Sequence, residues 1–94
     1  MTLETRLAQA HVMLLVMSKD EHGSKSVPLA RYGAYEVRLV EPPLGSTAFV
    51  FWLELFDHGC QVSIDSGGAD DFEEALATAE YLASRAEDLS KALF

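Results

Sequence analysis

The stretch of sequence that decides the fold runs from residue 48 to residue 65 and reads AFVFWLELFDHGCQVSID. Apolar side chains fill both faces of its first part, Ala48–Phe56, as is typical of a central strand. Apolar and polar residues alternate in its second part, Cys60–Asp65. The histidine–glycine pair between them favours a tight hairpin turn, because glycine tolerates a positive φ. The stretch therefore predicts two antiparallel strands.

The hydrophobic pattern also predicts the register of this hairpin. With a two-residue turn, Leu55 lies opposite Val62 and Leu53 lies opposite Ile64, so that apolar side chains pair on one face. A slip by one residue would place Leu55 opposite Gln61 instead. We therefore expect Val62 and Ile64 to face the core, and the serine and two glycines at 66–68 to end the strand.

A further strand is expected over Ala34–Glu41, upstream of this hairpin. Tyr35, Val37 and Leu39 alternate there with charged residues, which predicts one buried and one solvated face. The two prolines that follow end the strand, because proline cannot donate to a β-ladder. Pro28 keeps the residue before it extended, so regular structure is expected to resume only after it.

The N-terminal segment predicts a helix over about Leu3–Ser18, with Thr2 as its N-cap. From Val12 to Met17 the segment is apolar on all sides, which predicts cover on all sides, either within the domain or against a second copy. A strand over 11–17 is the alternative, because a short apolar run is ambiguous by periodicity. The polar segment Lys19–Ser26 is expected to be a loop.

The C-terminal segment predicts a long helix from Asp71 to about Ala92. Asp70 is the expected N-cap, and Glu73 stands at capping-box spacing from it. Such a helix is roughly 33 Å long, whereas an eight-residue strand spans only about 26 Å. We therefore expect the helix to overhang its sheet, leaving Leu89 and Leu93 without local cover.

These elements define one α+β domain over residues 1–94. It consists of a helix, a three-stranded antiparallel meander and a long C-terminal helix, with both helices on one face of the sheet. The core face of the sheet is expected to carry Tyr35, Val37, Phe49, Phe51, Leu53, Leu55, Val62 and Ile64.

The other face of the sheet is expected to carry Val40, Val50, Trp52 and Phe56 among polar residues. Aromatic side chains on an open face predict an interaction surface. Two alternatives remain open: segment 19–33 folds over this face, or Trp52 lies beneath the first helix. Together with the apolar helix ends, the candidate interface residues are Val50, Trp52, Phe56, Val12, Val16, Leu89 and Leu93.

The charge of the chain is uneven. Residues 1–46 carry equal numbers of basic and acidic side chains, so the net charge of −8 falls on residues 47–94. Such a field repels phosphate backbones, which excludes direct DNA or RNA binding and favours a basic protein partner or simple solubility. The single cysteine permits no internal disulfide, and the apolar runs are shorter than a membrane helix needs. We expect no signal peptide, because the apolar run Val12–Met17 is too short for a secretory segment. We expect a cytoplasmic protein of bacterial type with no membrane partner.

Residue patterns for catalysis or metal binding are absent from the sequence. No nucleophile elbow, Walker loop or dinucleotide fingerprint occurs, and His11, His22 and His58 lack metal-ligand spacing. His58 and Cys60 would supply only two ligands, and the acidic turn at 65–71 lacks the alternating oxygen positions of a calcium loop. We expect no cofactor, no metal and no catalytic residue.

Two families resemble parts of this pattern. The predicted element order is similar to that of double-stranded-RNA-binding domains, although the final helix begins with acidic residues where that family is basic. The segment WLELFDHGC at 52–60, followed by DFEEAL at 71–76, resembles HicB-type antitoxins over about residues 52–83. That resemblance implies an acidic inhibitor of a basic toxin. The chain departs from it in its first helix, its longer third strand and the lack of a DNA-binding tail.

The sequence thus predicts a small acidic non-catalytic domain that acts through protein–protein contact as a homodimer. One alternative is a HicB-like inhibitor of a basic partner. Another is a small-ligand-binding protein or an enzyme that uses the Trp52 sheet face or a dimer cleft.

Overall fold

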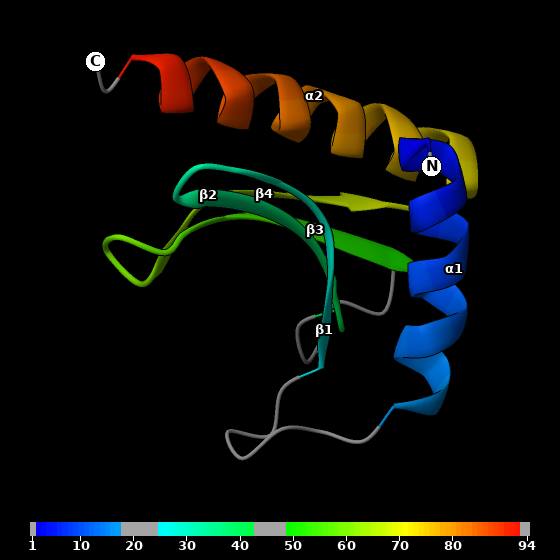
Figure 1. Cartoon of the computed structure of the whole chain (residues 1–94). Helices are drawn as coiled ribbons and strands as arrows, with labels where there is room; N and C mark the ends of the chain where they lie inside the picture. The colour runs from blue at the N-terminus through cyan, green and yellow to red at the C-terminus, as the bar shows by residue number, and fades with distance from the viewer. Residues whose placement is uncertain (1, 18–24, 43–48, 93–94) are drawn as a thin grey trace.

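The computed structural model describes residues 2–17, 25–42 and 49–92. Its elements are α1 (Leu3–Val16), β1 (Ser26–Tyr32), β2 (Tyr35–Val40), β3 (Phe51–Asp57), β4 (Val62–Ala69) and α2 (Phe72–Lys91). The strands form one antiparallel sheet in the order β1-β2-β3-β4. The sheet bends, and both helices lie on the outer side of the bend, with α2 along the strands and α1 across one end (Figure 1). The predicted α+β class and meander are confirmed, with one strand more than expected.

Both helices form where local signals place them. Thr2 caps α1, because its hydroxyl oxygen accepts from the Thr5 backbone N–H at 3.1 Å. Because α1 continues to Val16, the helical interpretation of residues 11–16 is right and the strand alternative is wrong. The cap of α2 is Asp71 and not Asp70: the Asp71 carboxylate accepts from the Glu74 N–H at 2.9 Å, and the Glu74 carboxylate accepts from the Asp70 N–H at 3.1 Å. The expected capping arrangement is thus shifted by one residue.

One hydrophobic core lies between the helices and the sheet. Leu7 and Ala10 of α1 are almost fully buried in it. The side of α2 that faces the sheet is mostly alanine, and such small side chains let helix and sheet backbones approach closely. The buried residues of α2 are Ala75, Ala79, Leu82, Ala83 and Ala86. Tyr35, Val37, Phe51, Leu53 and Leu55 are buried from the sheet, as predicted.

The strand β1 was not predicted. Val27 and Leu29 are buried on either side of Pro28, and the pairing with β2 shifts between Pro28 and Ala30. Proline is tolerated in a strand when that strand is at the edge of a sheet or carries a bulge, and β1 has both properties. Expecting Pro28 to precede all regular structure was therefore wrong. Residues 19–24 of the predicted loop, and Ser18 at the expected end of the first helix, lie outside the described residues.

The hairpin of β1 and β2, which the sequence analysis did not predict, lies close to the C-terminal end of α2. Gly33 takes a positive φ of 61° in the turn, and a Cβ placed on it would lie 3.6 Å from the Ser90 Cβ. Leu89 is half-buried and contacts the core. The expectation that Leu89 has no local cover was therefore wrong, because Leu89 packs against the core of its own domain. Leu93 lies outside the described residues.

The register of the β3–β4 hairpin differs from the prediction. Asp57 pairs with Val62 and Leu55 pairs with Asp65, with an irregularity between Leu55 and Phe56. The Asp57 carboxylate accepts from the backbone N–H groups two and three residues later, at 2.8 and 3.4 Å. This Asx turn widens the connection to four residues, and its positive φ falls on Gln61. The two-residue turn was therefore wrong.

The changed register reverses the predicted exposure of β4. Val62 and Ile64 are 47% and 36% exposed, so neither lies in the core. The glycines that were expected to end the strand lie inside it. A Cβ on Gly68 would come within 2.7 Å of the Phe49 ring, so the absence of a side chain there makes room for Phe49. Phe49 itself is 38% exposed rather than buried in the core.

Candidate functional site

The outward surface of α1 carries the largest run of exposed apolar side chains on any one helix or strand of the described chain. Val12, Met13, Leu15 and Val16 are 63%, 53%, 69% and 80% exposed. Only one side of the helix faces the core, with Leu7, Ala10 and Leu14 buried. We call the four exposed residues the α1 patch. The second half of α1 is therefore apolar on sides that the described residues leave exposed.

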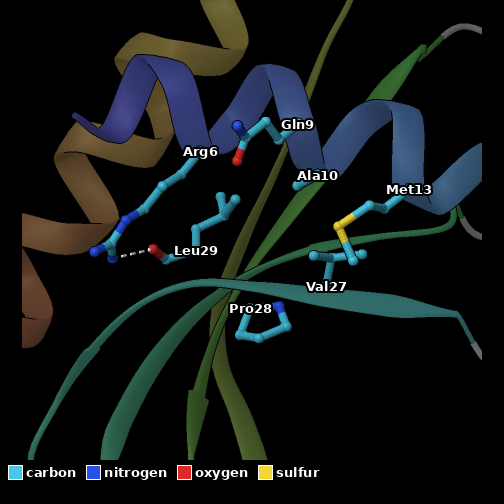
Figure 2. A pocket seen from close by; sticks show the side chains of 7 residues that line it. All are labelled: Arg6, Gln9, Ala10, Met13, Val27, Pro28 and Leu29. Atoms are coloured by element: carbon cyan, nitrogen blue, oxygen red, sulfur yellow. Dashed lines mark hydrogen bonds between the residues drawn. The ribbon is translucent and has the colours of Figure 1, made fainter. Parts of the chain in front are cut away.

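Two adjoining hollows border the α1 patch. One, of about 220 Å³, lies between α1 and β1 and is lined by Arg6, Gln9, Ala10, Met13, Val27, Pro28 and Leu29 (Figure 2). The Arg6 guanidinium closes one end of it by donating to the Leu29 carbonyl at 2.9 Å. The second, about 550 Å³ in volume, opens on the outer surface over Ala8, Gln9, Val12 and Met13. Gln9 and Met13 line both hollows, so the two lie side by side along α1.

The open face of the sheet carries an aromatic pair at one end. The rings of Phe49 and Trp52 are 5.8 Å apart, and Trp52 is half-buried. Val50 beside them is 55% exposed. Trp52 alternates along β3 with the buried, core-facing Phe51 and Leu53, so its side chain lies on the opposite face and not beneath α1.

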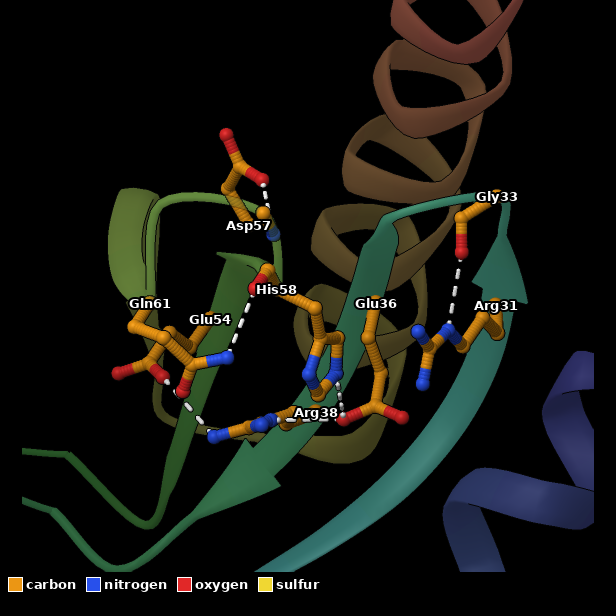
Figure 3. A network of polar contacts seen from close by, with 9 residues as sticks. Arg31, Gly33, Glu36, Arg38, Glu54, Asp57, His58 and Gln61 are labelled. Carbon is orange, nitrogen blue, oxygen red and sulfur yellow. Dashed lines mark hydrogen bonds and ion pairs between the residues drawn. The ribbon is translucent and has the colours of Figure 1, made fainter.

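A cluster of charged side chains occupies the other end of this face (Figure 3). The Arg38 guanidinium stacks 3.9 Å above the centre of the Phe56 ring, and its Nε donates to the Glu36 carboxylate at 2.8 Å. Arg38 also approaches the Glu54 carboxylate at 3.9 Å. The buried Nε2 of His58 lies 3.3 Å from the same Glu36 oxygen, at ion-pair distance but without hydrogen-bond geometry.

This cluster divides the apolar surface of the sheet. Arg38 and the His58 ring both lie against Phe56, and Glu54 stands between Phe56 and Trp52 on β3. The aromatic residues of the open face therefore do not form one continuous patch. An interface core needs contiguous apolar area. Of the two predicted surfaces, the α1 patch meets this condition better.

The other residues with possible chemistry have local structural roles. Cys60 is exposed, and the neighbouring Asp57 carboxylate raises the pKa of its thiol through a hydrogen bond and through charge repulsion of the thiolate. In the acidic turn, Asp65 pairs with Arg85 and Asp71 caps α2. Within residues 2–17, 25–42 and 49–92, no three His, Cys, Asp or Glu side chains gather closely enough to hold a metal ion.

The predicted interface residues thus fall into separate groups. Val12 and Val16 lie together on α1, whereas Val50, Trp52 and Phe56 lie on or beside the open sheet face. Met13 and Leu15 were missed, although both belong to the apolar run that the sequence shows at 12–17. Periodicity could identify that run but could not tell which of its sides stays exposed.

Comparison with known proteins adds no assignment. A scan against protein-family models, a search of curated proteins and a search of solved structures each found no match. In the described part of the chain, no helix has both the length and the apolar character needed to cross a membrane.

Proposed function

We propose that this chain is a small acidic, non-catalytic domain that acts through protein–protein contact as a homodimer. The observation that carries the proposal is the α1 patch, four large apolar side chains exposed within five residues of one helix. Apolar side chains that gather on one element in this way are typical of interaction sites, whereas single exposed ones need no explanation.

The size of the α1 patch is consistent with a reversible dimer. Its four residues expose the equivalent of roughly two and a half whole side chains per copy. Covering them in both copies contributes about 8–16 kcal/mol, at about 1.5–3 kcal/mol for each fully buried side chain. Association costs about 4–15 kcal/mol. Because the two terms are similar, the dimer should depend on protein concentration.

Charge favours α1 as the surface where two copies meet. The α1 helix contains one acidic residue, Glu4, and one basic residue, Arg6, so it carries no net charge. In contrast, α2 contains five acidic and two basic residues. Two copies that met through α2 would bring like charges together, whereas contact through α1 keeps most of the charge of each copy away from the interface.

Two matched substitutions test the proposal. Val16→Lys introduces a charge into the α1 patch, and Val62→Lys makes the same change at a valine that is exposed on β4. Sedimentation or light scattering over a concentration series should show a dimer for the wild type and for Val62→Lys, and a monomer for Val16→Lys. A wild type that stays monomeric up to the highest soluble concentration would overturn the proposal.

The acidic surface of α2 supports a second candidate, a HicB-like inhibitor of a basic partner. Glu73, Glu74, Glu80, Glu87 and Asp88 are all exposed on this helix. A partner bound through them should dissociate as salt rises, because exposed ion pairs are screened. Co-purification at low and high salt, followed by identification of a basic protein released only at high salt, would support this candidate.

A further inference from the structure

A row of three residues runs along the outer side of α1. Ala8, Val12 and Val16 are spaced four residues apart, so they lie one above another on the helix surface. The smallest of them, Ala8, lies in the hollow of about 550 Å³, and the most exposed, Val16, lies one turn beyond that hollow. The row therefore has a small side chain in a shallow hollow at one end and a projecting side chain at the other.

We infer that this surface binds the α1 helix of a second copy, antiparallel, with the two-fold axis beside Val12. Val16 of each copy then packs over Ala8 of the other. The inference rests on the proposed function and specifies the surface and the geometry of its dimer.

Helix geometry explains why the crossing point is Val12. In an antiparallel pair that crosses there, each step of four residues moves about 6 Å from the axis in opposite directions, so Val16 comes opposite Ala8. Rows of residues four apart pack into one another at a crossing angle of about −50°, the commonest arrangement of packed helices. A parallel pair would set Val16 against Val16 and would leave the hollow over Ala8 empty in each copy.

The neighbouring side chains fit the same arrangement. Met13 extends from α1 towards Val27 (Figure 2). Its side chain therefore does not project across the row of Ala8, Val12 and Val16. Leu15 comes opposite Gln9, whose methylene groups can cover it. The two copies of Glu4 lie at opposite ends of the pair, roughly 24 Å apart along the helices, which is well beyond the screening length at physiological salt.

Disulfide trapping tests the geometry, with Cys60→Ser as the background because Cys60 is the only cysteine. Under mild oxidation, Val12→Cys should form a covalent dimer by itself, because residues on a two-fold axis face their own copies. A mixture of Ala8→Cys and Val16→Cys should cross-link about tenfold faster than either variant alone, since each alone sits roughly 12 Å from its own copy. Val62→Cys, an exposed position outside the inferred interface, is the control and should not form a covalent dimer at a comparable rate.

A second pair of variants needs no cysteine. Ala8→Leu fills the hollow and should weaken the dimer about tenfold or more, because Val16 of the partner no longer fits. Ala77→Leu makes the same change at an exposed alanine of α2 and should leave the dimer unchanged. Circular dichroism would confirm that both variants keep their helices.

The outcomes separate this inference from the proposed function. A dimer in which Val12→Cys does not cross-link, or in which Ala8→Leu associates as the wild type does, overturns the inferred geometry and leaves the homodimer standing. A wild type that is monomeric at every concentration overturns both.

Discussion

At the scale of single residues, Cys60 shows how one carboxylate controls a neighbouring thiol. The Asp57 side chain forms the turn and raises the pKa of the Cys60 thiol, so less of it is thiolate at any given pH. Asp57→Asn keeps an oxygen that can accept the turn hydrogen bonds but removes the negative charge. We expect the pH profile of alkylation by iodoacetamide to move to lower pH in this variant. Asp65→Asn is the control, and coincident profiles for wild type and Asp57→Asn would contradict the assigned cause.

The Glu36 carboxylate holds two neighbouring side chains in place on the open sheet face. It is shared by Arg38 and by the buried Nε2 of His58, and Arg38 in turn covers Phe56. Arginine stacked on an aromatic ring shields apolar area while it keeps hydrogen bonds to carboxylates. These contacts explain why a face rich in aromatic residues need not be an interface.

At the scale of elements, Leu76 and Leu82 of α2 differ in how deeply they are buried. Leu82 is 1% exposed, whereas Leu76 only borders the core. We expect Leu82→Ala to lower the free energy of unfolding by about 2–5 kcal/mol, the usual cost of a cavity at a buried leucine. Leu76→Ala should cost clearly less. Urea titrations of both variants measure the difference, and equal losses would show that the two leucines share one environment.

At the scale of the whole molecule, the net charge of −8 opposes association of two copies. The Debye length shortens from about 10 Å at 0.1 M salt to about 3 Å at 1 M. Dimerisation through α1, which carries no net charge, should therefore strengthen as sodium chloride rises from about 0.05 to 0.5 M. Sedimentation equilibrium at both salt concentrations measures this change, and Val16→Lys should stay monomeric at both. A dimer that dissociates at high salt would indicate an interface made of ion pairs.

The sequence by itself determined the features whose signals act over a few residues. Helical periodicity and the capping residues identified α1 and α2 to within a few residues, alternation identified β2, and a run that is apolar on both faces identified β3. The apolar run at 12–17 also indicated a helix that needs more cover than one side of a domain supplies. These signals persist in the fold because each depends on contacts within one turn or one strand.

Only the tertiary structure decided the features that depend on neighbours in space. Pro28 could belong to a strand because β1 lies at the edge of the sheet, which is a property of the whole sheet. The Asx turn at Asp57 and the bulge beyond it overrode the apolar pairing that favoured a different register. The cover of Leu89 came from the core that the helices and the sheet form together. The exposure of Val12 and Val16 was decided in the same way, because a helix of this size can lay only one side against a single core.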